Sequence, residues 1–105
     1  MKILKLVKQT ACYTTGDWKV SMLIEVVIHD YDFDDTKFDY IAFDQFIRKK
    51  IEGQRFFPEE ISVMMGKVTQ ELMRKCGVAN PTGIIVKVST KRDDRHMNVI
   101  SEITL

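Results

Sequence analysis

A run of strict period-two alternation constrains the fold of this chain more than any other feature. Within residues 18–29 every second residue is apolar: Trp18, Val20, Met22, Ile24, Val26 and Ile28. Successive side chains of a strand point to opposite faces of a sheet, so this pattern predicts a strand with one buried face. Leu23 and Val27 add apolar side chains to the second face, which is therefore expected to invite contact with another subunit.

A hairpin is predicted at the start of the chain. Residues 3–13 also have the pattern of a strand, and residues 14–17 read Thr-Thr-Gly-Asp. These four residue types are typical of turns. Two strand-like runs separated by such a short turn predict an antiparallel pair.

The apolar period changes to helical after an acidic loop at residues 29–35. Residues at helical spacing predict a first helix with one buried face: Phe38, Ile41, Phe43, Phe46, Ile47 and Ile51. Thr36-x-x-Asp39 resembles a capping box at the start of this helix. Gly53 is predicted to close the helix as its C′ residue.

A second helix is predicted to begin at Pro58, because proline suits a first helical turn. Glu59 and Glu60 follow, where carboxylates favour the positive end of the helix dipole. Gly77 is predicted to end the helix. Its expected buried face consists of Ile61, Met64, Met65, Val68, Leu72 and Cys76.

The period returns to two in the last part of the chain. Residues 84–89 alternate, and a charged turn at residues 91–95 separates them from a final strand. The apolar and small residues of that strand are Met97, Val99, Ser101, Ile103 and Leu105. The order ββααββ predicts a single α+β domain over residues 1–105, with a four-stranded antiparallel sheet and both helices on one face. Periodicity leaves open how the two hairpins join.

Charge and composition exclude several classes of function. The formal net charge is +1, from 16 basic and 15 acidic residues, so no global basic field favours nucleic acid. No apolar run of about 18 residues predicts a membrane helix, and the lysines within residues 1–8 argue against a secretory leader. Cys12 and Cys76 form no CxxC pair, which indicates a reduced, cytoplasmic protein. His29 and His96 are the two histidines, too few for a histidine-rich zinc site, so no metal is expected.

Three passages carry a resemblance to a known family. Residues 34–40 read Asp-Asp-Thr-Lys-Phe-Asp-Tyr, residues 51–60 read Ile-Glu-Gly-Gln-Arg-Phe-Phe-Pro-Glu-Glu, and residues 85–91 read Ile-Val-Lys-Val-Ser-Thr-Lys. Together with the ββααββ order, they resemble the tunnelling-fold (T-fold) family. Within it the chain is most similar to dihydroneopterin aldolase and dihydroneopterin triphosphate epimerase. The resemblance covers residues 30–91 and, more loosely, the whole chain.

The resemblance implies an assembly and a chemistry. Sheets of neighbouring subunits would join into a ring-shaped homo-oligomer, a tetramer or octamer, with a pterin or purine-like ligand bound between subunits and no cofactor. Glu59 or Glu60 would bind the amino-pyrimidine edge of the ligand. Lys91 and Tyr40 would transfer protons in the retro-aldol step of a folate-biosynthesis lyase. Helix phase favours Glu59 as the anchor, whereas counting from Tyr40 without a gap favours Glu60.

Other functions stay open at this point. Ala11-Cys12-Tyr13-Thr14 stands where the family has a Tyr-His-Gly segment, which leaves room for a non-catalytic pterin- or purine-binding or structural relative. Cys12 and Asp17 echo the nucleophile and aspartate of the queuosine-pathway nitrile reductase. A third alternative is a monomeric α+β interaction module whose exposed sheet edge pairs with a partner.

Overall fold

The computed structural model describes residues 2–13, 19–92 and 96–105. The strands and helices follow the predicted order, with a 3₁₀ turn added before the first helix. Their bounds are β1 Ile3–Tyr13, β2 Lys19–His29, η1 Asp35–Lys37, α1 Tyr40–Lys50, α2 Pro58–Lys75, β3 Ile84–Arg92 and β4 His96–Thr104.

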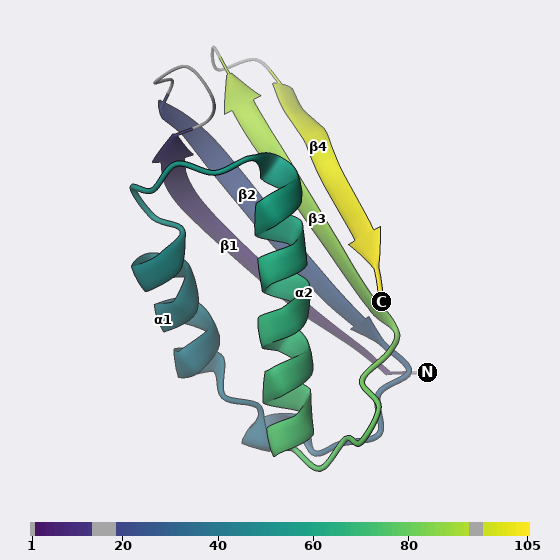
Figure 1. Ribbon diagram of the computed structural model, residues 1–105. Coiled ribbons are helices and arrows are strands. Elements are labelled where there is room, and N and C mark those ends of the chain that lie inside the picture. The colour runs from purple at the N-terminus through teal and green to yellow at the C-terminus, as the bar shows by residue number, and fades with distance from the viewer. Residues whose placement is uncertain (1, 14–18, 93–95) are drawn as a thin grey trace.

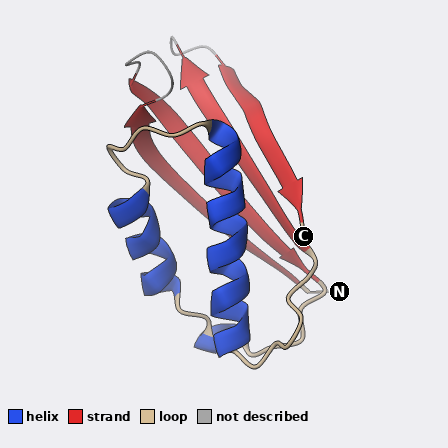
Figure 2. Cartoon of the chain, viewed as in Figure 1, coloured by secondary structure: helices blue, strands red, loops and turns tan. Residues whose placement is uncertain are grey.

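The four strands form one open antiparallel sheet in the order β1-β2-β3-β4. The two hairpins therefore join through β2 and β3, where Ile24 pairs with Val88. Figures 1 and 2 show both helices on one face of this sheet. The predicted α+β class, the antiparallel sheet and the one-sided helix layer are confirmed.

The core lies between the helices and the sheet. Alternate residues of β2 and β3 are buried on the helix side, as the period-two pattern requires. Ile24, Val26 and Val88 are fully buried there, and Phe43 of α1 and Met65 of α2 lie in the same core. This core fixes which residues of each strand face the helices and which face away.

The first helix begins later than its sequence predicts. Asp39, not Thr36, is its N-cap, and the Asp39 carboxylate accepts a hydrogen bond from the Ala42 N–H at 2.9 Å. Thr36 lies in the separate η1 turn, where its N–H and hydroxyl both donate to the Asp34 carboxylate. Two Asp caps in succession divide the predicted element into a turn and a helix.

The connection between the helices extends the sheet edge. Gly53 does not directly close α1, whose C-cap is Ile51. With a φ of +72°, Gly53 turns the chain toward β1 and donates its N–H to the Ala11 carbonyl at 2.8 Å. Tyr13 then donates its N–H to the Gln54 carbonyl at 2.8 Å. The second half of the β1 edge is thus occupied by the connection.

Helix α2 packs against strands β3 and β4 of the sheet. The predicted ends are confirmed: α2 starts at Pro58, and Gly77 follows its C-cap with a φ of +93°. Its buried face also includes small residues that the apolar pattern did not indicate, namely Ser62, Gly66 and Thr69. A Cβ at Gly66 would lie 2.7 Å from Cδ1 of Leu105. Small side chains therefore let the helix approach β4 closely.

A β-bulge changes the faces of β4. Val88 pairs with Ser101, but Ser89 pairs with Val99, so the pairing skips Ile100. An extra residue in one strand reverses the faces on either side of it. Period two alone predicts that Val99 and Ser101 share a face. The bulge places them on opposite faces instead, and Val99 is 55% exposed.

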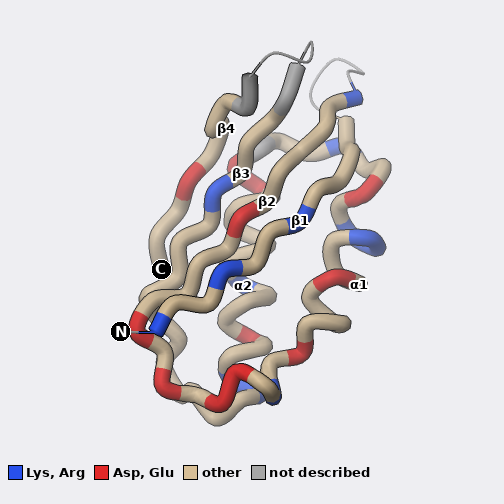
Figure 3. Tube along the Cα trace, turned by 180° about the vertical axis from the view of Figure 1, so that it is seen from behind, with Lys and Arg blue, Asp and Glu red and all other residues tan. Residues whose placement is uncertain are grey.

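The sheet face that points away from the helices is mixed in character. Leu23, Val27 and Ile85 are half-buried there, so the expected second apolar face exists. Charged residues cross the middle of this face, and Figure 3 shows basic and acidic positions alternating from β1 to β4. The face is thus neither a continuous apolar patch nor a uniformly charged surface.

Candidate functional site

The two candidate anchor residues lie in the first turn of α2. Both Glu59 and Glu60 are exposed. The Glu60 carboxylate accepts a long hydrogen bond from the Phe57 N–H at 3.4 Å, which helps to cap the helix. The Glu59 carboxylate makes no hydrogen bond or ion pair with the described residues. Of the two glutamates, Glu59 is therefore the one whose carboxylate oxygens accept no hydrogen bond from the described residues.

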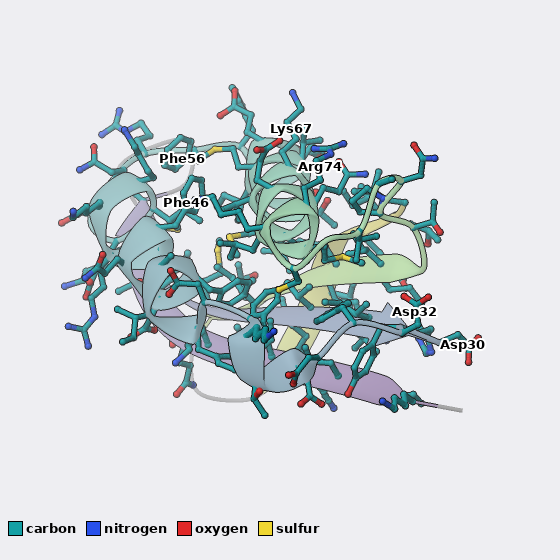
Figure 4. All side chains as sticks on the ribbon, turned by 90° about the horizontal axis from the view of Figure 1, so that it is seen from below. Asp30, Asp32, Phe46, Phe56, Lys67 and Arg74 are labelled. Atoms are coloured by element: carbon teal, nitrogen blue, oxygen red, sulfur yellow. The ribbon has the colours of Figure 1, made fainter. Side chains whose placement is uncertain are left out.

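An apolar hollow adjoins these carboxylates. It measures about 530 Å³ and is lined by Phe56, Glu59, Glu60, Val63 and Met64. Phe56 projects into the space between the helices, beside Phe46 of α1 (Figure 4). The hollow is shallow and its wall is almost wholly apolar, so Glu59 and Glu60 contribute their methylene groups to it and not their carboxylate oxygens. Such a surface offers a planar heterocycle a stacking face beside the start of α2.

Tyr40 is the first residue of α1 and is 40% exposed. Its hydroxyl donates a hydrogen bond to the Asp35 carbonyl at 2.9 Å, and its ring packs on Phe38 with the centroids 5.2 Å apart. Burial, together with the charge of Asp35, raises the pKa of the Tyr40 phenol. The phenol is therefore held in its protonated form at neutral pH.

Lys91 occupies the next-to-last position of β3, where it pairs with Ser21 on one side and Met97 on the other. Its side chain lies outside the described part of the structure. The end of β3 and the start of α2 lie at the same end of the molecule (Figure 1). The backbone at Lys91 thus lies at the end of the molecule where the two glutamates are found.

A single subunit does not bring the four candidate residues together. Helices α1 and α2 run in opposite directions (Figure 1), so Tyr40 and the two glutamates mark opposite ends of the helix layer. The proton-transfer pair inferred from the resemblance is split in the same way. A site that uses Tyr40 together with Glu59 needs a second copy of the chain.

Cys12 is fully buried, and its thiol lies 3.8 Å from the Met22 sulfur. Burial raises the pKa of the Cys12 thiol. Cysteine nucleophiles react as thiolates, so a buried thiol with a raised pKa is unsuited to that role. Asp17, its partner in the nitrile-reductase alternative, lies outside the described residues.

The acidic loop before α1 does not gather its carboxylates around a common point. Asp30 and Asp32 project outward (Figure 4), whereas Asp34 and Asp35 accept hydrogen bonds from Thr36 and from the Tyr31 hydroxyl. Among the described residues no group of three His, Cys, Asp or Glu side chains could hold a metal ion.

Neither described helix combines the length and apolar character needed to cross a bilayer.

A polar groove between β1 and α1 was not predicted. Lys8 Nζ lies 3.0 Å from the Asp44 carboxylate, and Arg48 Nε lies 3.9 Å from it. The Lys8 hydrogen bond lowers the pKa of the Asp44 carboxyl. Thr10 also lines the groove, and its buried hydroxyl finds no partner among the described residues. The Asp44–Arg48 spacing of four was the available signal, but nothing in the sequence placed Lys8 opposite.

The chain matches no protein-family model, no curated protein and no solved structure.

Proposed function

We propose that this protein is a tunnelling-fold homo-oligomer that binds a pterin or purine-like heterocycle between subunits, with Glu59 as the anchor. One observation carries the proposal: the Glu59 carboxylate, which has no hydrogen-bond or ion-pair partner among the described residues, stands at a helix start beside an apolar hollow. A carboxylate accepts two parallel hydrogen bonds from the ring N–H and exocyclic amine of such a ligand. The helix dipole favours the ionised carboxylate that this contact requires.

Glu59 is preferred to Glu60 because the two side chains differ in the hydrogen bonds they already make. Binding through Glu60 would compete with its contact to the Phe57 N–H, whereas binding through Glu59 would cost no existing hydrogen bond. The proposal therefore gives Glu59 the ligand and Glu60 the helix cap.

The sheet edges support assembly into a ring. Four of the large exposed apolar residues in the described chain lie on or beside the edge strands: Ile3 and Val7 on β1, and Val99 and Leu105 on or after β4. An antiparallel sheet with an even number of strands leaves β1 and β4 running in opposite directions, so β4 of one copy can pair with β1 of the next. A tetramer or octamer would close such a ring, and the free thiols Cys12 and Cys76 suit a reduced cytoplasm.

Catalysis would be a retro-aldol cleavage of the ligand side chain. In a retro-aldol cleavage, a base removes the side-chain hydroxyl proton of the dihydropterin, and the carbon–carbon bond breaks. Glycolaldehyde leaves, the electron pair enters the dihydropterin ring, and an acid protonates the product carbon. Lys91 and Tyr40 are the proposed proton-transfer groups that the resemblance implies. Copies joined edge to edge share one orientation, so the β1–β4 junction keeps Tyr40 at the far end of the helix layer, and bringing the pair together needs another contact between copies.

The test is equilibrium binding of 7,8-dihydroneopterin to the full-length chain, followed by mass-spectrometric detection of glycolaldehyde. Glu59→Gln should weaken binding by about 10- to 150-fold, the scale of a lost charge-assisted hydrogen bond of about 1.5–3 kcal/mol. Glu60→Gln should weaken binding less. Glu71→Gln, a change farther along α2, is the matched control and should bind as the wild type does. Equal affinity in all four proteins would refute the anchor.

A non-catalytic binding protein is the second candidate, because the Tyr40 hydroxyl is already engaged with Asp35. The two candidates separate in the same assay. An enzyme releases glycolaldehyde, and Lys91→Ala and Tyr40→Phe abolish the release while the affinity for the heterocycle stays the same. A binding protein shows wild-type affinity for the ligand and releases no product.

A further inference from the structure

The first half of β1 lies at the sheet edge, where no other strand of the described residues besides β2 pairs with it. The Ala11 carbonyl and the Tyr13 N–H point outward, because both bond to the connection at residues 53–56. Backbone groups of successive strand residues point to alternate sides, so the odd residues before Ala11 also point outward. Lys5 and Val7 therefore offer N–H and carbonyl groups that a further strand can use.

The end of β4 presents the complementary edge. Leu105 and Ile84 exchange two backbone hydrogen bonds, at 2.8 and 3.2 Å, so the backbone of Leu105 points inward to β3. By the same alternation, Thr104 and Glu102 point outward. Both edges lie at the end of the sheet where the two chain termini meet (Figure 1).

A row of alternating charges crosses the sheet face that points away from the helices. Lys5 Nζ lies 3.6 Å from the Glu25 carboxylate. Glu25 pairs in register with Lys87, and Lys87 pairs with Glu102. The row reads plus, minus, plus, minus from β1 to β4, as Figure 3 shows. It begins with a lysine at one free edge and ends with a glutamate at the other.

We infer that Glu102 of one copy pairs with Lys5 of the next copy, so that the charge row continues across the junction. This inference rests on the proposed edge-to-edge assembly and names the residues that set its register. A shift of one residue would turn the side chains of one strand to the wrong face, so registers differ by steps of two. The register we infer places Glu102 directly opposite Lys5, because directly opposite side chains on a strand pair lie closest together.

Charge also disfavours the alternative symmetric junctions. Two β1 edges facing each other would bring Lys5 near another Lys5, and two β4 edges would bring Glu102 near another Glu102. Like charges opposite each other destabilise a strand pair. The head-to-tail junction is the one that joins opposite charges, and head-to-tail contacts are those that generate rings.

Cysteine cross-linking between separately made variants tests the contact. One sample carries Lys5→Cys and the other Glu102→Cys, both with Cys76→Ser to remove the half-buried thiol. Within one chain the two positions are three strands apart, about 14 Å, which is too far for the roughly 7 Å limit of a disulfide. A covalent dimer should therefore form on mild oxidation of the mixture, and not in either variant alone.

A matched control replaces Glu102→Cys with Glu25→Cys, which lies on the same face but on an inner strand. That mixture should give no covalent dimer. Dimers in the Lys5→Cys sample alone, or equal cross-linking with Glu25→Cys, would overturn the inference.

Charge reversal gives a second test. Lys5→Glu and Glu102→Lys should each fail to assemble alone at a concentration where the wild type assembles. A one-to-one mixture should assemble, because every junction in an alternating ring then joins opposite charges. No recovery in the mixture of folded variants, verified by circular dichroism, would overturn the pairing.

The sedimentation behaviour of the wild type distinguishes this inference from the proposed function. A monomeric wild type would refute both the ring and the contact. An oligomeric wild type without the Lys5–Glu102 cross-link would refute the contact alone and leave assembly and ligand binding standing.

Discussion

The hydroxyl oxygens of Ser62 and Ser101 lie 2.7 Å apart and join α2 to β4. Ser62 is fully buried and donates its own hydrogen to the Glu59 carbonyl at 3.1 Å, so the proton between the two serines belongs to Ser101. The first turn of α2, which carries the candidate anchor, is thus fastened to an edge strand of the sheet.

Replacing either serine should destabilise the fold. Ser62→Ala and Ser101→Ala should each lower the free energy of unfolding by about 1 kcal/mol, the net value of a hydrogen bond. Because the two side chains share one bond, the double variant should lose less than the sum of the single losses. Chemical denaturation of all four proteins measures this coupling. Strictly additive losses would mean that the bond contributes nothing.

Gly66 should tolerate no large side chain. A Cβ at this position would meet Cδ1 of both Leu105 and Ile103, at 2.7 and 3.1 Å. Gly66→Leu should therefore lower the free energy of unfolding by about 1–3 kcal/mol through overpacking. The exposed neighbour provides the control, since Lys67→Leu should change stability by less than about 0.5 kcal/mol. Thermal unfolding of the two variants gives the comparison, and equal stability would mean that the ends of the Leu105 and Ile103 side chains move aside for the new side chain.

Acid should weaken the attachment of α1 to β1. Lys8 lowers the folded-state pKa of Asp44, so the ionised carboxylate contributes stability above the pKa of an unfolded Asp, about 4. That contribution disappears as the pH falls through the lower, folded-state pKa. Asp44→Asn should therefore be less stable than the wild type at pH 7, and the difference should shrink below about pH 4. Urea unfolding across this range measures the effect, and a difference independent of pH would contradict it.

The two thiols should react at different rates. Cys76 is half-buried and Cys12 is fully buried, and burial raises the pKa of both thiols. Titration of the native protein with a thiol reagent should modify Cys76 first and Cys12 only after denaturant is added. Cys76→Ser isolates the second signal. Rapid modification of Cys12 in that native variant would revive the nucleophile hypothesis.

Much of the fold could be predicted because the apolar period changes where the structure changes. The alternation around Ile24 gave β2, and the stripe through Ile61 and Leu72 gave α2. The join between the hairpins could not be predicted, since periodicity describes each strand alone. The bulge at Ile100 was also hidden, because an extra residue leaves no mark on residue types and becomes visible only when β4 is paired with β3.

The start of α1 was misplaced for a different reason. Both Asp34 and Asp39 are good N-cap residues, and the sequence cannot show that the chain uses both in succession. For the candidate site, the sequence predicted which element each residue lies on, but not how far apart the residues lie in space. The positions of Glu59 and Glu60 at a helix start followed from Pro58, but the separation of Tyr40 from them depends on the opposite directions of the two helices.

The order of the strands has a consequence for how the chain folds. Each hairpin closes a short loop, but the central pair of strands joins residues more than half the chain length apart, as Ile24 and Val88 do. Closing so long a loop costs entropy before the contact is gained. The hairpins are therefore expected to form early, with the β2–β3 seam completed only once the helices between them have collapsed onto the sheet. Substitutions in the early hairpins should therefore slow refolding, whereas substitutions along the seam should mainly speed unfolding.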